Sequence, residues 1–379
     1  MASVELILHF SGPDEVNVSF DGTDSGQLAF TNPVTQKDRS DIRWYVETYG
    51  AQSLADPDDK EARRIEARLP EIGKALFRAV FHAGEGEGKD VFRDFRDAKA
   101  KERVLTLNAQ DASILSLPWE LLHEPTGKFL FRDKPHISIR RKISGATGGR
   151  KPFRVKAKKH LHLLFVVSRP TDAGFIDPRA DPQAVLAALD THATGRVTWE
   201  FLYPPTLESL VERLNDDELP AVDILHFDGH GMFSAVSQAD IEKDPALYAK
   251  STLSEIQRER QRRGTESSQR VGVGFLLFEN DEGHKHLVSA ADLEDNLFRH
   301  EVGLVVLSAC QTASMDAEAG DPMASVAGKL THAGIPAILA MTHSVLVRTT
   351  ETLFGKFYQS LAKGHGIATS LDDARSFEG

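Results

Sequence analysis

The sequence has little cysteine and no long apolar run, and each shortage excludes a class of protein. Cys310 is the one cysteine among 379 residues, so no disulfide can form within the chain, and we expect a reducing compartment. The longest apolar stretches fall far short of the ~20 residues that a membrane-spanning helix needs. The N-terminus has no basic stretch followed by an apolar one, so no secretory signal is predicted. We therefore expect a cytoplasmic protein that is not bound to a membrane.

Basic residues are fewer than acidic ones, which argues against a nucleic-acid-binding surface. The chain has 45 Lys and Arg residues against 56 Asp and Glu residues, a formal net charge of -11. Because this excess repels a polyanion, we expect no direct nucleic-acid partner. The hydrophobic content of 41% and the charged content of 27% are ordinary for a globular protein, and the length suits two domains.

Residues 1–150 have the pattern of a small α+β region. Apolar and polar residues alternate over Val4–Phe10 and Val16–Phe20, which predicts short strands. Apolar residues recur at helical spacing over Asp59–Phe81. The region ends in Ser144–Pro152, a glycine-rich stretch with basic flanks, which we interpret as a solvated linker rather than as a binding site for an acidic partner. We predict a domain boundary at residue 150.

The pattern changes after the linker, because strands and helices alternate over residues 151–379. Such alternation implies crossover connections and a mainly parallel sheet covered on both faces. The predicted strands are Leu161–Val167, Val197–Tyr203, Val222–Phe227, Val273–Phe278, Val302–Leu307 and Ala337–Ala340. The predicted helices are Pro182–Leu189, Leu207–Leu214, Ala290–Leu297, Met323–His332 and Glu351–Leu361.

A polar stretch at 242–270 interrupts this alternation. It is predicted to form a helix that runs into an exposed loop, and its end is rich in arginine. We interpret it as a solvated insertion, with a protease-sensitive or docking segment as the alternative.

Two strands end in residues that can carry chemistry. The apolar run before Ser308 leads to Cys310, and the apolar run before Asp228 leads to His230, which lies between two glycines. A free cysteine is most often a core residue, and a lone histidine is most often structural. If the two strands are neighbours, however, both side chains emerge at one edge of the sheet, where α/β folds place their sites. A thiolate nucleophile with an imidazole base would then be assembled, with the amides of Gly231 and Cys310 as an oxyanion hole.

A metal site is the alternative use of these histidines. His226 and His230 are four apart, a spacing that suits a metal on a helix, and His284 is a third candidate ligand. In a strand, however, residues four apart lie more than ~10 Å from each other. We therefore predict no metal and no other cofactor.

The two motifs together resemble the signature pair of CHAT domains, which are caspase-like cysteine proteases often found with tetratricopeptide repeats. The histidine motif is His-Phe-Asp-Gly-His-Gly at 226–231, and the cysteine motif is Val-Val-Leu-Ser-Ala-Cys-Gln-Thr-Ala at 305–313. Further similar segments are Pro118–Leu122, Phe275–Phe278, His286–Leu293 and Ala333–Ala337. The resemblance covers roughly residues 100–379.

The resemblance implies an α/β fold of the caspase type in residues 151–379, a three-layer sandwich around a mainly parallel sheet. It implies a cysteine endopeptidase with His230 and Cys310 as its dyad and Gly231 and Cys310 as its oxyanion hole. The expected partners are a protein substrate and an activating sensor, such as a tetratricopeptide repeat or ligand-sensing module, in bacterial signalling or defence. Residues 1–150 would be a degenerate caspase-like half or an adaptor. A catalytically idle scaffold that binds partners is the alternative.

The spacing of the two motifs departs from that of caspases. His230 and Cys310 are 80 residues apart, against about 50 in caspases, and the insertion at 242–270 accounts for most of the excess.

Asp228 and Ser308, at the ends of the two motif strands, are the residues expected to line the substrate pocket. A carboxylate there would favour a basic side chain before the cleaved bond, by the charge logic of trypsin's pocket. The alternative is that Asp228 caps the turn at Gly229.

Overall fold

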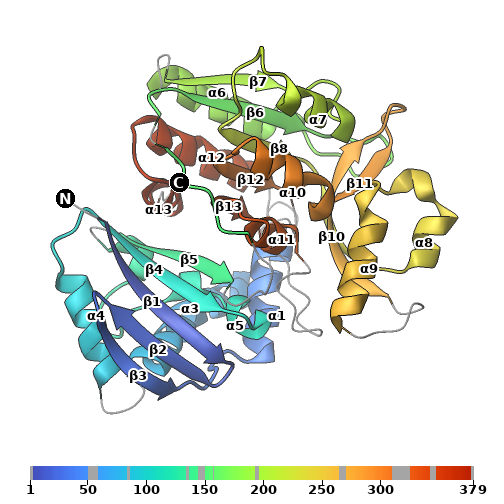
Figure 1. Ribbon diagram of the computed structural model, residues 1–379. Helices are drawn as coiled ribbons and strands as arrows, with labels where there is room; N and C mark the ends of the chain where they lie inside the picture. Colours follow the sequence, from blue (N-terminus) through green and yellow to red (C-terminus); the bar gives the residue numbers. More distant parts are fainter. Residues whose placement is uncertain are drawn as a thin grey trace. The chain divides into compact units, whose positions relative to one another are not determined.

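The computed structural model describes residues 3–49, 59–82, 86–133, 136–143, 150–156, 158–192, 196–263, 270–309, 325–341 and 347–376 (Figure 1). The chain divides into two compact units. The first contains residues 1–145 and 352–379, and the second contains residues 146–351. The division between them falls in the glycine-rich stretch. The C-terminal segment 352–379, which the sequence analysis grouped with the second domain, belongs to the first unit.

The first unit is built on a mixed five-stranded sheet in the order β3-β2-β1-β4-β5. Strands β1 (Ser3–Gly12), β2 (Glu15–Phe20) and β3 (Thr23–Ala29) form an antiparallel meander, and β4 (Glu102–Ala109) and β5 (Ile137–Ile143) continue in parallel from β1. The helices are α1 (Gln36–Arg43), α3 (Asp59–Phe81), α4 (Glu87–Asp97), α5 (Ala112–Leu115) and α13 (Ile367–Arg375), with a π-helix η1 (Trp44–Tyr49) and 3₁₀ turns η2 (Trp119–Leu121) and η3 (Leu130–Arg132). This unit therefore combines a mixed sheet with helices.

A buried tryptophan anchors the first unit. Trp119 is fully buried, and its indole N–H donates to the carbonyl of Ile114 at 2.7 Å. Helix α3 approaches the same turn so closely that a Cβ on Gly73 would lie 1.8 Å from the carbonyl oxygen of Leu121. A helix can pass this close to backbone only where a side chain is absent.

The second unit contains a fully parallel five-stranded sheet in the order β13-β12-β8-β6-β7. Its strands are β6 (Leu161–Val167), β7 (Val197–Phe201), β8 (Ile224–Asp228), β12 (Leu304–Ser308) and β13 (Ala337–Ala340). The prediction of a mixed α/β protein with a mainly parallel sheet is confirmed.

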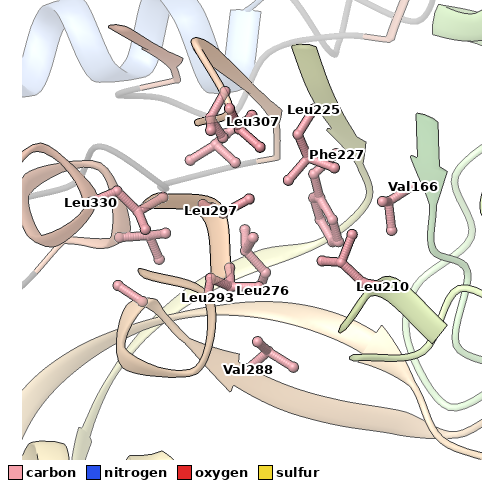
Figure 2. Packing of buried hydrophobic residues seen from close by; sticks show 14 of the residues in the cluster. Val166, Leu210, Leu225, Phe227, Leu276, Val288, Leu293, Leu297, Leu307 and Leu330 are labelled. Atoms are coloured by element: carbon pink, nitrogen blue, oxygen red, sulfur yellow. The ribbon is translucent and has the colours of Figure 1, made fainter. Parts of the chain in front are cut away.

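Helices cover one face of this sheet through a continuous hydrophobic core. Side chains of β8, such as Leu225 and Phe227, alternate with residues that point to the other face, as strand geometry requires. Figure 2 shows them beside Val166 of β6 and near Leu210. The helices that contribute are α7 (Leu207–Asn215), α10 (Ala290–Arg299) and α11 (Val326–His332). The second unit also contains α6 (Ala180–His192) and the first residues of α12 (Val347–Ala362), whose later residues belong to the first unit.

One predicted strand belongs to a different sheet. The strand expected at Val273–Phe278 is β10 (Val271–Glu279), which lies between β9 (Gly231–Val236) and β11 (Lys285–Ser289) in a separate antiparallel sheet. The prediction that it joins the parallel sheet is wrong. Because β10 is buried almost throughout, it has the continuous apolar run that is otherwise typical of a parallel strand.

The insertion is also more buried than predicted. It contains the end of α8 (Gln238–Lys243), the 3₁₀ turn η4 (Pro245–Leu247) and α9 (Ser251–Arg263). Ile256 packs with Val273 and Phe275 of β10 in a second hydrophobic cluster, and Leu253 packs against it. The interpretation as a purely solvated insertion is therefore wrong for its described part, since a few apolar residues at helical spacing suffice to dock it. Residues 264–269 lie outside the described part.

Candidate active site

The two motif strands are neighbours, and their carboxyl ends meet. Strands β8 and β12 pair in parallel with Asp228 opposite Ser308, and the amide of Gly229 extends the ladder by donating to the carbonyl of Ser308 at 3.1 Å. His230 and Cys310 each follow two positions after this pair. Cys310 itself lies outside the described residues. The condition that the two motif strands are neighbours is thus met by β8 and β12.

The His230 imidazole is oriented by a backbone carbonyl. Its Nε2 lies 2.6 Å from the carbonyl oxygen of Gly174, and the half-buried ring packs against that residue. A carbonyl oxygen only accepts hydrogen bonds, so Nε2 carries the proton in the neutral ring and Nδ1 carries the lone pair. The His230 carbonyl accepts in turn from the amide of Leu277 at 3.0 Å. The geometry therefore makes Nδ1 the nitrogen that can take up a proton.

Gly229 has its place in the motif because of close packing rather than an unusual backbone angle. A Cβ at this position would lie 2.9 Å from the ring of Phe227 and 3.1 Å from the carbonyl oxygen of Ser168. A side chain here would force the ring of Phe227 or the carbonyl of Ser168 to shift.

Asp228 is buried and paired with an arginine that follows β6. The carboxylate accepts from Arg169 Nη2 at 2.8 Å, and the Asp228 side chain is only 6% exposed. Burial raises the pKa of Asp228 to about 7, although Arg169 opposes this change, and the nearby Asp181 raises it further. Asp228 therefore changes its protonation state close to neutral pH.

Ser308 belongs to a second buried polar group on the same edge. Its hydroxyl donates to the carboxylate of Asp181 at the start of α6, and the hydroxyl of Thr350 donates to the same carboxylate at 2.8 Å. Burial raises the pKa of Asp181.

The assignment of Asp228 and Ser308 to the substrate pocket stays a prediction, and the contacts argue against it. Both side chains are buried, and both already bind partners inside the protein. Since Arg169 compensates the charge of Asp228, little charge remains to attract a basic substrate side chain. The observed partner of the Asp228 carboxylate is Arg169, and the alternative that Asp228 caps the turn at Gly229 stays a prediction.

Gly231, the other predicted oxyanion donor, begins β9 and lies opposite Leu276 of β10. Its partner in that prediction, the amide of Cys310, lies outside the described residues, so the oxyanion hole stays a prediction.

The histidines considered for a metal site have different surroundings and different partners. His226 is fully buried in β8, where burial lowers its pKa to about 3, and its ring packs against Phe165 at 5.1 Å. His284 is exposed in the turn before β11, with its Nδ1 3.4 Å from a carboxylate oxygen of Glu282. Within the described ranges, no group of three or more His, Cys, Asp or Glu side chains is arranged to hold a metal ion.

The sequence did not indicate the residues that bind Asp228, Ser308 and His230, which are Arg169, Asp181 and Gly174. Arg169 is the second residue after the end of β6, and Asp181 is 49 positions before His230. The available signal was a charged residue just beyond the carboxyl end of a buried strand of the same sheet. Gly174 had no signal at all, because it acts through its backbone.

Residues 71–377 match the CHAT domain family. The chain therefore belongs to the CHAT-domain family, which is related to the caspase-like cysteine proteases. No curated protein matches the chain. Among the described helices, none is both long enough and apolar enough to cross a membrane.

Proposed function

We propose that the protein is a cysteine endopeptidase in which His230 activates Cys310. The observation that carries the proposal is the parallel pairing of β8 and β12 with Asp228 opposite Ser308, since it brings the two motif ends to one edge of the sheet. Membership of the CHAT-domain family supports the same chemistry. The tautomer of His230 supports it further, because Nδ1 is left to accept a proton.

The proposed reaction is acyl transfer through a thioester. His230 Nδ1 takes the proton from the Cys310 thiol, and the thiolate sulfur attacks the carbonyl carbon of the scissile peptide bond. The imidazolium then returns a proton to the leaving amine as the C–N bond breaks. A water molecule hydrolyses the thioester, with His230 accepting its proton and returning it to the thiolate. Amides at Gly231 and Cys310 would stabilise the oxyanion of both steps.

The finer features expected from the resemblance belong to the same proposal. They are a three-layer caspase-like sandwich, a protein substrate, and an activating sensor module or partner. They also include a role in regulated signalling or defence in a bacterial cytoplasm. Proteolysis requires the Cys310 thiol, whereas binding of a partner does not. Replacement of Cys310 by alanine therefore separates proteolytic activity from partner binding.

Proteolysis of a bacterial proteome by the wild-type protein and by Cys310→Ala tests the function. We expect new protein N-termini, identified by N-terminal labelling and mass spectrometry, with the wild type and none above background with Cys310→Ala. The incubation is repeated with native cell lysate from the source of the protein, so that an activating partner is present. Identical N-termini in both samples under both conditions would favour the idle scaffold.

A further inference from the structure

Arg169 uses its whole guanidinium group to bind the ends of two strands and one loop. Nε donates to the carbonyl of Ile176 at 3.0 Å. Nη1 donates to the carbonyls of Ser168 at 2.9 Å and Asp228 at 2.6 Å. Nη2 donates to the Asp228 carboxylate at 2.8 Å and to the carbonyl of Asp177 at 3.3 Å. All five N–H donors of an arginine are therefore used, four of them on backbone oxygens.

The loop that Arg169 binds also carries the carbonyl that orients His230. Gly174 lies two residues before Ile176, and its oxygen accepts from His230 Nε2 at 2.6 Å. The other side of the loop is fixed by Thr171, whose amide donates to the carbonyl of Gly283 at 2.9 Å. Arg169 thus fixes one side of the short segment that presents the Gly174 carbonyl, and it binds the end of the strand that precedes His230.

We propose that Arg169 is a positioning residue that fixes the orientation and tautomer of His230 through the loop at Gly174. The inference rests on the proposed function only in naming His230 as the base. A guanidinium is required because its donors point outward in a plane and reach several carbonyls at once, whereas a lysine concentrates three donors at one point. Charge alone, through the pair with Asp228, would not hold the loop.

Arg169→Lys tests this role because it keeps the positive charge beside Asp228 and removes the fork of donors. The tautomer of His230 is read from imidazole ¹⁵N shifts in long-range ¹H–¹⁵N spectra of histidine-labelled protein, and its signals are identified by their loss in His230→Gln. In the wild type at high pH we expect Nε2 protonated and Nδ1 unprotonated. In Arg169→Lys we expect the two nitrogen shifts to move toward each other, as in a ring that exchanges between tautomers.

Arg179→Lys is the matched control. Arg179 is 73% exposed, and its side chain contacts the carboxylate of Asp177 rather than the loop carbonyls. We expect its His230 shifts to equal those of the wild type. Asp228→Asn is the second control, because it removes the ion pair and keeps the four carbonyl bonds, so it should also preserve the tautomer.

Wild-type His230 shifts in a folded Arg169→Lys protein would overturn the proposal, and so would an equal loss of the tautomer in Asp228→Asn. If Arg169→Lys does not fold, Arg169→Met combined with Asp228→Asn removes both charges, so that neither is left buried without its partner. The same shift change is expected there, and wild-type shifts would again overturn the proposal.

The spectroscopic result does not depend on proteolysis. If the wild type cleaves no protein but Arg169→Lys changes the tautomer, the proposed function fails and the positioning role stands. If cleavage depends on Cys310 while the tautomer is unchanged, only the positioning role fails. Where cleavage is observed, we expect Arg169→Lys to lower kcat about 10- to 100-fold with little change in KM, since small displacements of a catalytic group cost about this much.

Discussion

Replacing His230 by glutamine is expected to lower kcat for peptide cleavage by about 10²- to 10⁴-fold, the usual contribution of a positioned general acid–base group. Glutamine retains a side-chain N–H that can donate to the carbonyl of Gly174, so the loop contact seen at 2.6 Å can persist. It has no nitrogen that accepts a proton near neutral pH. The loss therefore reports proton transfer rather than loss of structure, and kcat on a substrate from the proteome experiment measures it.

The control for this variant is His284→Gln. His284 is exposed in the turn before β11 and binds no part of the candidate site. Its replacement should leave kcat and KM unchanged, and this result would also exclude the metal site considered from the sequence. Equal activity of His230→Gln and the wild type would remove His230 from the mechanism.

Replacing Asp228 by asparagine is expected to change how stability depends on pH. The pKa of Asp228 is raised from 3.8 in the unfolded chain to about 7 in the folded protein, so between these values the folded state binds more protons. The free energy of unfolding therefore falls as pH rises through this interval, by about 3 kcal/mol between pH 5 and pH 8 from this one group. Asparagine resembles the protonated acid and should abolish this part of the fall.

Burial of the Asp228 carboxylate raises its pKa, and the ion pair with Arg169 opposes this rise only in part. The charge of Arg169 is shared among four carbonyl oxygens as well as the Asp228 carboxylate, so the ion pair does not fully offset the cost of burying that carboxylate. Protonation of Asp228 leaves Arg169 with most of its acceptors. Asp181 acts in the same direction, because burial raises its pKa as well.

Urea unfolding at pH 5 and pH 8 measures the effect, with Asp240→Asn as the control. Asp240 lies in the exposed cap of α8, where hydrogen bonds from Ser237 lower its pKa. Its replacement should leave the fall between pH 5 and pH 8 in place. An equally steep fall in Asp228→Asn and in the wild type would show that Asp228 is ionised throughout this range.

The sequence was sufficient for those parts of the fold that depend on local pattern. The strand expected at Leu161–Val167 is β6, the helix at Asp59–Phe81 is α3, and the strand at Ala337–Ala340 is β13, all with the expected bounds. The adjacency of the two motif strands was only a condition at that point, because buried runs separated by helices favour one parallel sheet without fixing the order of its strands. The sequence did not predict that β10 pairs with β9 and β11 in an antiparallel sheet. An apolar run that is buried on both faces has the same pattern in a parallel and in an antiparallel sheet.

The candidate site was predictable only where side chains carry the chemistry. His230 stands out in the sequence, because two glycines flank it after a buried run. The Gly174 carbonyl accepts from its imidazole, and the carbonyls of Ile176 and Asp177 accept from Arg169. Every residue has a carbonyl, so the sequence does not mark these three. The role of Arg169 follows only from the folded backbone that brings these oxygens around one guanidinium.

The central claim, that His230 activates Cys310, is tested most directly by the pH dependence of iodoacetamide labelling at Cys310. Because the chain has one cysteine, the gain of a single carbamidomethyl group in an intact mass spectrum reports this residue alone. In the wild type we expect the labelling rate to rise with a midpoint well below the ordinary thiol pKa of about 8.5. In His230→Gln the midpoint should return toward that value. The account would be contradicted by two coincident profiles, each with the rate and midpoint of an ordinary thiol.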